Sequence, residues 1–252
     1  MELIVLGKDG MWASRGGATA GYLVRHDGFS MWVDLGTGTL ANLQRHIGLL
    51  DVGAVVVSHR HPDHLVDLFP YLYARVYGSD QPPMGTPLFG PPDLFDRVRA
   101  LISGAGADEL ATSFQLTEVT PGDEMQAGPF RIRTAGMAHP VPTLGLRVET
   151  DGGVLSYTAD TGPTDAIVDL AKDADLLVSE ASWQDDGAEY PADLHLNARQ
   201  AGEHGRRAGA KRLLLTHIKP TLDRDISRTE AASAFEGEVM LAAEGMVVEV
   251  GG

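Results

Sequence analysis

The segment 59–64, His-Arg-His-Pro-Asp-His, constrains the fold and the chemistry of this chain more than any other stretch. It follows the apolar run 54–58, which predicts a buried β-strand. In an extended chain the residues i and i+2 point to the same side, so the first two histidines can bind one cation. The proline turns the chain, and Asp63 and His64 can then serve a second cation nearby. Three imidazoles and a carboxylate would be costly to bury without a metal, so the segment predicts a dinuclear site at the carboxyl end of a strand.

The composition narrows the metal ligands and the partners. The chain has 252 residues and no cysteine, so histidine and carboxylate side chains must supply the ligands. Zinc and manganese both accept this donor set. The formal charge of −15 disfavours a partner whose binding depends on neutralising many phosphates. The composition therefore argues against long nucleic acid as a partner.

Length and patterning also bear on domains and location. A chain of this length can bury one large core and no low-complexity linker divides it, so we expect a single domain over residues 1–252. Residues 1–7 are typical of a short strand and lack the features of a signal peptide. No apolar run approaches the roughly 20 residues that span a bilayer. We therefore expect a cytoplasmic protein with no membrane partner.

Short runs of Val, Leu, Ile and Tyr predict strands in two series, accompanied by helical stretches. The expected strands are 3–6, 20–25, 31–35, 54–58, 130–134, 144–149, 154–158, 176–179, 212–216 and 246–250. The expected helices are 93–102, 165–171, 198–208 and 228–235. Residues 78–92 are rich in Gly and Pro and predict an irregular loop, which either overhangs the site or is a plain surface connection. The pattern favours an α/β fold in which two sheets pack together with helices outside.

The pattern His-x-His-x-Asp-His resembles the metallo-β-lactamase superfamily, and other signature residues of that superfamily occur here in the expected order. They are Asp34 in Val-Asp-Leu-Gly-Thr-Gly, His139 in Ala-His-Pro, Asp160 in Tyr-Thr-Ala-Asp-Thr and His217 in Leu-Thr-His. The resemblance runs from about residue 3 to residue 250. It implies an αββα sandwich, in which two mixed β-sheets pack face to face with helices on the outside.

The resemblance also implies two divalent metal ions, zinc by expectation and manganese as the alternative. The first ion would be held by His59, His61 and His139, the second by Asp63, His64 and His217, and Asp160 would bridge them. Asp34 would orient a ligand or its loop from behind. The alternative is that Asp34 is an ordinary aspartate that caps the Gly-rich turn after its strand.

Two further motifs indicate the type of reaction. Segments 179–183, Ser-Glu-Ala-Ser-Trp, and 195–201, His-Leu-Asn-Ala-Arg-Gln-Ala, resemble motifs of the phosphodiesterase branch, which includes tRNase Z. In that branch the residues matching Glu180 and His195 form a pair beside the metals. A histidine held by a carboxylate can stay protonated near neutral pH and donate its proton to a leaving alkoxide, while Asp63 would help orient the attacking nucleophile. The alternative is that Glu180 ends a strand and His195 begins a helix, with no part in catalysis.

The spacing of the motifs bears on the substrate. The tRNA-processing members carry a long arm between the positions that match His139 and Asp160, but only 20 residues separate them here. The runs Asp-Leu-His-Leu at 193–196 and Leu-Leu-Leu-Thr-His-Ile at 213–218 resemble atypical bacterial cyclic-nucleotide phosphodiesterases. A small phosphodiester is therefore the expected substrate, with a 3',5'-cyclic nucleotide as the best choice.

Three other functions remain open at this stage. They are a tRNase Z-type RNA 3'-processing endonuclease, a lactone or thioester metallo-hydrolase of the same fold, and a non-enzymatic nucleotide-binding module. The second would not need the Glu180 and His195 pair, and the third would not need a complete ligand set. The sequence does not show the oligomeric state, and a homodimer is suggested only because dimers are common in the resembling family.

Aromatic and basic residues are candidates for substrate contact. Aromatic faces accept a purine, and the candidates for stacking are Tyr71, Tyr73, Tyr77 and Trp183. Core packing is the alternative for each of them. Arg147 can meet a phosphate, or it can pair with an acidic neighbour on its strand.

Overall fold

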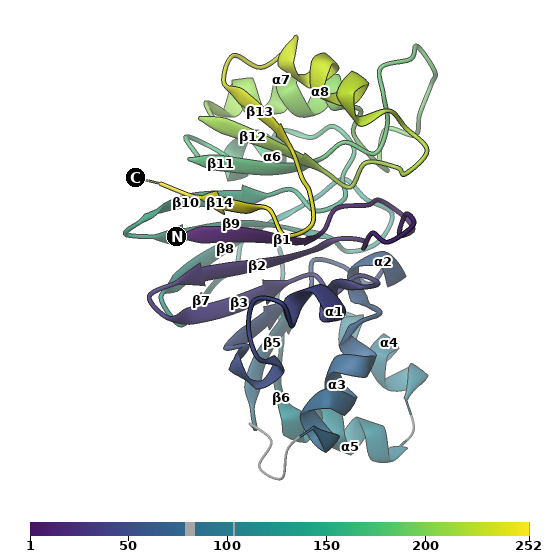
Figure 1. Ribbon diagram of the computed structural model, residues 1–252, viewed down its shortest axis with the longest axis vertical. Helices are drawn as coiled ribbons and strands as arrows, with labels where there is room; N and C mark the ends of the chain where they lie inside the picture. The colour runs from purple at the N-terminus through teal and green to yellow at the C-terminus, as the bar shows by residue number, and fades with distance from the viewer. Residues whose placement is uncertain (79–83, 103, 252) are drawn as a thin grey trace.

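Two seven-stranded mixed sheets form the centre of the protein, and the helices lie on their outer sides (Figure 1). The structure is a computed structural model and describes residues 1–78, 84–102 and 104–251. The first sheet has the order β14-β1-β2-β3-β4-β5-β6, with β1 Glu2–Gly7, β2 Gly21–His26, β3 Phe29–Val33, β4 Ala54–Val56, β5 Thr86–Gly90, β6 Phe114–Glu118 and β14 Val247–Glu249. The second sheet has the order β13-β12-β11-β10-β9-β8-β7, with β7 Glu124–Ala127, β8 Phe130–Gly136, β9 Leu144–Thr150, β10 Gly153–Tyr157, β11 Leu176–Glu180, β12 Arg212–Thr216 and β13 Glu238–Leu241. The predicted αββα sandwich is confirmed.

The helices divide between the two outer faces. Against the first sheet lie α1 Thr39–Leu43, the 3₁₀ turn η1 Leu49–Asp51, α2 Pro62–Leu65, α3 Leu68–Tyr77, α4 Leu94–Leu101 and α5 Gly104–Ser113. Against the second lie α6 Asp165–Leu170, α7 Ala198–Ala208 and α8 Arg224–Ala232. Among the described residues, none of the helices has both the length and the apolar character needed to cross a membrane.

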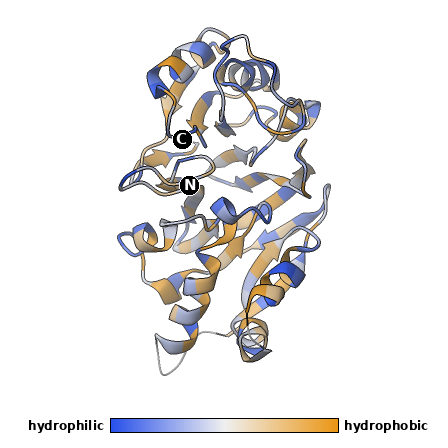
Figure 2. Cartoon of the chain, turned by 90° about the vertical axis from the view of Figure 1, so that its right-hand side faces the viewer, coloured by the Kyte–Doolittle hydropathy of each residue, from blue (hydrophilic) through white to orange (hydrophobic). Residues whose placement is uncertain are grey.

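The strands bury both of their faces, because each sheet lies between its partner sheet and a layer of helices. In β1 the side chains of Leu3 and Val5 join the core between the sheets, while those of Ile4 and Leu6 join the core under the helices. Successive side chains of an extended chain point to opposite faces, so a strand that is covered on both faces carries apolar residues at consecutive positions. Apolar residues accordingly concentrate on the strands in Figure 2.

Parallel pairing brings several strand ends to one edge of the sandwich. β3, β4, β5 and β6 pair in parallel in the first sheet, and β10, β11, β12 and β13 do so in the second. Side chains that follow these strands therefore meet at a shared edge, where ligands bind in open α/β sheets.

The structure corrects parts of the element prediction. The expected loop 78–92 contains an interior strand of the first sheet, Thr86–Gly90, while residues 79–83 lie outside the described part of the chain. Residues 69–77, which precede that loop and are rich in aromatic side chains, belong to α3. The helix expected over 228–235 spans Arg224–Ala232, because the Asp223 side chain accepts a hydrogen bond from the Asp225 amide and caps the helix early.

Candidate metal centre

The predicted metal ligands meet in two clusters at the shared edge of the sheets. The first cluster is His59, His61, His139 and Asp160, and the second cluster is Asp63, His64, Asp160 and His217. Within each cluster the possible ligand atoms all lie within 4.8 Å of one another. The structure thus brings all seven residues together, while their binding of metal stays a prediction.

Local structure after β4 separates the ligands of the segment 59–64. His61 is the N-cap of α2 and has extended backbone, and Pro62 occupies the first turn, where its missing amide costs no hydrogen bond. Asp63 and His64 then lie on the first turn of the helix and point toward the second cluster. The change from strand end to helix within six residues therefore divides one motif between two clusters.

Asp160 lies between the two clusters. Its Oδ1 is 3.2 Å from His64 Nε2 and 3.4 Å from His217 Nε2, and its Oδ2 is 3.7 Å from His59 Nε2. In the first cluster, His61 Nδ1 lies 3.1 Å from both His59 Nε2 and His139 Nε2. This carboxylate is therefore placed to bridge two cations.

Hydrogen bonds behind the clusters determine which ring nitrogen faces inward. His64 Nδ1 donates to the Asp34 carboxylate at 2.8 Å, and His139 Nδ1 donates to the Leu194 carbonyl at 2.9 Å. His59 Nδ1 lies 3.0 Å from the Ser58 hydroxyl, which donates its own proton to Asp34 and so accepts from the ring. Each of these three histidines therefore keeps its proton on Nδ1 and presents the lone pair of Nε2 to the cluster.

His217 is held in the same way by a residue that the sequence argument did not single out. The Ser182 hydroxyl donates to Glu180 Oε2 at 2.7 Å and accepts from His217 Nδ1 at 2.9 Å. His217 Nε2 is thereby free to face His64 Nε2, 3.2 Å away. Ser182 belongs to the Glu-Ala-Ser motif, which was the signal that could have identified it.

These features fit two divalent cations. The Nε2 atoms of His64 and His217 face each other at 3.2 Å, and their lone pairs repel unless a cation or a proton lies between them, because outer hydrogen bonds already hold both Nδ1 protons. Asp160 Oδ1 is buried and receives no hydrogen bond from the described residues. Imidazole with carboxylate oxygen is a donor set that suits zinc and manganese.

Burial and neighbouring charges favour the ligand forms of most of these groups. Burial, reinforced by the other histidines, holds the pKa of His59 well below its usual value, and burial also lowers the pKa of His61 and His139. Burial would raise the pKa of Asp160, but the His217 and His64 rings outweigh it and hold that pKa well below the usual range. His64 differs, because the Asp160 and Asp34 carboxylates outweigh burial and raise its pKa.

Asp34 supports the second cluster, as the resemblance implied. The side chain is fully buried, with Oδ1 accepting from the Ser58 amide at 2.7 Å. Its Oδ2 accepts from the Ser58 hydroxyl, from His64 Nδ1 and from the Tyr157 hydroxyl, each at 2.8 Å. These contacts fix the ring of His64, so the alternative of a simple turn cap does not account for them.

Glu180 and His195 form the expected pair beside the clusters. Their Oε1 and Nδ1 atoms are 2.9 Å apart, and Glu180 also accepts from the Thr161 amide at 2.7 Å. Burial disfavours the charged ring, but the Glu180 carboxylate outweighs burial and raises the pKa of His195 to about 9. The ring is therefore protonated at neutral pH in this environment.

Local packing holds the His195 ring in place. The Trp183 ring contacts it edge to face at 5.2 Å, and the Tyr190 ring stacks on Trp183 at 4.2 Å. Backbone hydrogen bonds join Trp183 to Leu196 and Ala198, and a capping box of Asn197 and Gln200 begins α7 there.

A loop that carried no recognised motif also reaches the second cluster. The Met11 amide donates to Asp63 Oδ2 at 2.9 Å from a left-handed backbone with φ 68°. The neighbouring Trp12 is 43% exposed, and Lys219 lies 5.9 Å from the centre of its ring. Gly10 allows the approach, since a Cβ there would lie 2.5 Å from the His217 carbonyl oxygen. A backbone amide leaves no trace in side-chain patterns, so the sequence offered no signal for this contact.

The predicted substrate-contact residues have mixed outcomes. The prediction of Tyr71 as a stacking residue is wrong, because its ring is fully buried against Trp32 at 5.2 Å. Tyr73 and Tyr77 are exposed on α3 and contact each other, so their contact with a substrate stays a prediction. Trp183 lies beside His195, as described above.

Arg147 does not face a phosphate site. Its guanidinium donates to Glu149 and to the carbonyls of Leu170 and Lys172. These bonds join β9 to the end of α6, so the alternative of pairing with an acidic neighbour is confirmed.

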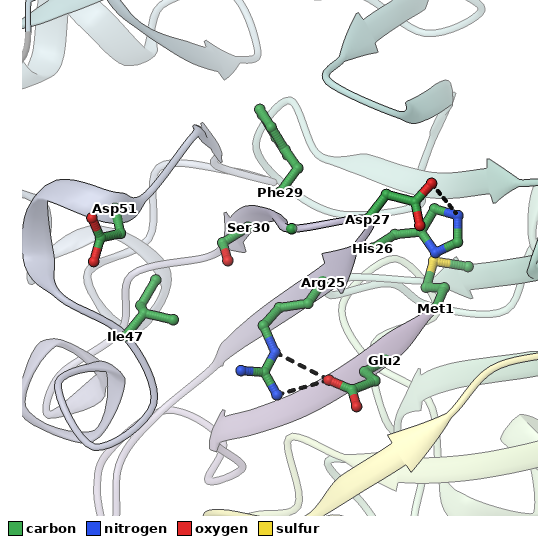
Figure 3. A pocket seen from close by; sticks show the side chains of 10 residues that line it. Met1, Glu2, Arg25, His26, Asp27, Phe29, Ser30, Ile47 and Asp51 are labelled. Atoms are coloured by element: carbon green, nitrogen blue, oxygen red, sulfur yellow. Dashed lines mark hydrogen bonds and ion pairs between the residues drawn. The ribbon is translucent and has the colours of Figure 1, made fainter.

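A hollow of about 510 Å³ lies at the opposite edge of the sandwich, around the turn between β2 and β3 (Figure 3). Several of its charged residues are paired. Arg25 donates to Glu2 at 2.7 Å, and His26 Nε2 lies 2.8 Å from Asp151. The hollow is therefore separate from the two clusters and offers no ligand set of their kind.

Comparison with known proteins places the chain in a family. A family model for the β-lactamase superfamily domain matches residues 17–218. An uncharacterised protein of Mycobacterium tuberculosis is 34% identical over 243 residues, which cover 95% of this chain and 88% of the relative. The probable metallo-hydrolase YhfI of Bacillus subtilis is 32% identical over 251 residues, which cover 99% of this chain and 100% of the relative. Superposition of the crystal structure of YhfI on this chain gives a TM-score of 0.88, with 98% of each chain covered and 30% identity.

A ribonuclease Z from Kineococcus radiotolerans is 30% identical over 284 residues, which cover 94% of this chain and 90% of the relative. Human tRNase Z, short form, has a TM-score of 0.79 at 22% identity, with 99% of each chain covered, and so shows the shared fold. The chain therefore belongs to the metallo-β-lactamase superfamily, in the group that also contains ribonuclease Z and the probable metallo-hydrolase YhfI.

Proposed function

We propose that the protein is a dinuclear metal-dependent phosphodiesterase that hydrolyses a small phosphodiester. The observation that carries the proposal is the His195–Glu180 pair, 2.9 Å apart, beside two clusters of metal-ligand type. Hydrolysis of a phosphodiester expels an alkoxide, which needs a proton, and this pair can supply one. Lactone or thioester hydrolysis does not need such a pair, and a binding module has no use for a proton donor.

The residues of the two clusters have distinct parts in this proposal. His59, His61 and His139 would hold one cation, Asp63, His64 and His217 the other, and Asp160 would bridge them. Two divalent cations supply the Lewis acidity that makes water nucleophilic at neutral pH and neutralises charge on the phosphoryl oxygens. We propose zinc for both, with manganese as the alternative.

The chain's own groups position the nucleophile and move the proton. Asp63 Oδ2 accepts from the Met11 amide and lies 3.2 Å from His217 Nε2 on the side of the second cluster, which leaves Oδ1 to accept a hydrogen bond from the attacking water. His195 donates its Nδ1 proton to Glu180, which leaves the Nε2 proton for the departing oxygen. The raised pKa of His195 keeps that proton in place at pH 7.

The connection between His139 and Asp160 supports a small substrate. It contains β9 and β10, which pair from Thr150 and Gly153 at their tight turn. The rest of this connection is residues 140–143, 151–152 and 158–159, which are too few for an arm that clamps tRNA. Together with the charge of −15, this supports a small diester, and a 3',5'-cyclic nucleotide is our specific choice.

The second candidate function is RNA 3'-processing of the tRNase Z type. It is favoured by the 30% identity to ribonuclease Z of Kineococcus radiotolerans across 94% of this chain. It requires the acidic protein to hold a long polyanion without an arm in the β9–β10 connection, which is why we place it second.

A substrate panel tests the proposal. Zinc- and manganese-loaded protein is assayed against 3',5'-cyclic AMP, 2',3'-cyclic AMP, a pre-tRNA and a lactone. We expect turnover of the 3',5'-cyclic nucleotide, which His61→Ala abolishes. The matched control is His204→Ala, since His204 is a buried histidine on α7 that donates to the Gln200 carbonyl outside the clusters. Cleavage of pre-tRNA alone would favour the second candidate, and turnover of the lactone alone would overturn both.

A further inference from the structure

A second hollow, of about 260 Å³, adjoins the first cluster. Its walls come from the segments after β5 and β6 and from the loop between β8 and β9. His139 belongs to its lining and also to the first cluster, where its Nε2 lies 3.1 Å from His61 Nδ1. The hollow therefore continues the edge of the sandwich at which the clusters lie.

The lining of this hollow is apolar and carries no Asp, Glu, Lys or Arg among the described residues. Five of its residues are prolines, at positions 91, 92, 121, 140 and 142. Met137 and Val141 add further apolar surface. The Thr143 hydroxyl is occupied in donating to the Val141 carbonyl at 2.9 Å. The lining thus favours an uncharged apolar group over a phosphate or an amine.

The walls are held in place before any ligand binds. Proline fixes its own φ, so these segments lose little freedom on binding. The Met137 amide donates to the Thr143 carbonyl at 3.0 Å and closes the loop. The Leu144 amide donates at 3.0 Å to the carbonyl of Ser58, which directly precedes His59. The hollow is therefore fixed relative to the first cluster.

The volume limits what the hollow can take. Pockets that bury a whole small molecule measure roughly 300–1,000 Å³, so about 260 Å³ suits a part of one. Proline-rich surfaces pack well against aromatic faces, as complexes of proline segments with aromatic grooves show. A single aromatic ring in a substrate whose phosphoryl group lies at the clusters meets the requirements of size, charge and surface chemistry.

We infer that this hollow, here called the proline hollow, is a subsite for an aromatic ring carried by the substrate. The inference rests on the proposed function for the identity of the reacting group. The proline hollow selects by apolar contact and shape, because its lining offers no charged side chain to recognise the ring edge. Aryl and heteroaryl phosphodiesters, nucleotides among them, are then preferred over alkyl diesters.

Binding measurements on the zinc-loaded protein test the inference. The probes are phenylphosphonate and methylphosphonate, which present similar phosphonate groups and differ in the ring. We expect phenylphosphonate to bind about tenfold or more tightly, as burial of a ring predicts. Val141→Asp places a charge in the hollow and should remove this preference, whereas Val141→Leu keeps the apolar lining and should retain it.

The matched control is Val247→Asp, because Val247 is exposed on β14 at an outer edge of the first sheet. This variant should keep the wild-type ratio of affinities. Equal affinities of the wild type for both probes would overturn the inference, as would a preference that survives Val141→Asp. Turnover of bis-p-nitrophenyl phosphate is measured in parallel. Turnover can be absent while the wild type still prefers phenylphosphonate and Val141→Asp loses this preference. In that case the proposed function is wrong and the subsite stands.

Discussion

Replacement of Asp34 by asparagine should weaken one metal site without dismantling the fold. The Ser58 amide is a fixed donor to Oδ1, so the remaining oxygen of the asparagine must stay there. The new NH2 group then occupies the position of Oδ2 and faces His64 Nδ1, which was 2.8 Å from that oxygen. Because the NH2 group is a donor, His64 must accept with Nδ1 and carry its proton on Nε2. That proton points into the second cluster, where the lone pair is needed.

The structure sets the size of the effect. Loss of a hydrogen bond that orients a metal ligand typically costs about 10- to 100-fold in metal affinity, and here the wrong tautomer adds to that loss. The new NH2 group has two hydrogens and faces three groups, so it can donate to His64 Nδ1 and to one of the hydroxyls of Ser58 and Tyr157, while the other hydroxyl loses its partner. The free energy of unfolding should therefore fall by only about 1–3 kcal/mol, the cost of one poorly matched buried group.

Competition between the protein and a chromophoric chelator measures both zinc affinities, and urea denaturation measures stability. Asp175→Asn is the control, because that carboxylate accepts from the Val154 amide at 2.8 Å just before β11, at the edge away from the clusters. It should leave both zinc affinities unchanged. If Asp34→Asn binds two zinc ions with wild-type affinity, Asp34 does not orient His64 for a metal.

Three further predictions concern catalysis and metal binding. His195→Ala should slow hydrolysis of a diester with an alkoxide leaving group by about 10²- to 10⁴-fold in steady-state assays. The loss should be much smaller for a diester that releases p-nitrophenolate, because this group leaves without a proton. Equal losses for the two substrates would contradict the general-acid role. Since the Glu180 carboxylate outweighs burial and raises the pKa of His195 to about 9, the ring is protonated below that pH and activity falls as the pH rises through it. Glu180→Gln should move this alkaline limb of the kcat/KM profile to lower pH, and an unmoved limb would argue against the pair. At a zinc concentration fixed at 100 times the wild-type Kd, binding should raise the free energy of unfolding of the wild type by about 2.7 kcal/mol per site, measured by denaturation with and without chelator. Asp160→Asn should reduce that gain, and a full gain would exclude a bridging role.

The sequence predicted the elements whose patterns are local. The continuous apolar run at residues 3–6 was enough to identify β1, because a strand with both faces buried is apolar at every position. Likewise, an apolar run that ends in clustered imidazoles identified the end of β4. Such signals lie within a few residues and need no knowledge of the rest of the chain.

The parts that were missed depend on neighbours distant in sequence. Pro87 and Gly90 made β5 resemble a loop, yet it is an interior strand of the sheet, because β4 and β6 pair with it on either side. The same holds for the Met11 amide, which reaches Asp63 across 52 positions. A pattern within one segment cannot show which strand edge will be covered or which amide will be brought to a carboxylate.

Backbone strain coincides with the residues that deliver the clusters. Asp34, Ala159 and His217 adopt left-handed conformations with φ of 56°, 52° and 53°, at or just beyond the ends of β3, β10 and β12. A non-glycine residue in this region costs on the order of 1 kcal/mol or more, and a chain under selection for stability alone would place glycine or asparagine there. The turn at each strand end directs Asp160 or His217 into the clusters, where the ligand atoms lie within 4.8 Å of one another, or brings Asp34 to the ring of His64. A functional site that must hold charged groups close together is expected to keep such strain at the strand ends that form it. A cluster that served only packing would give no reason to keep the strain.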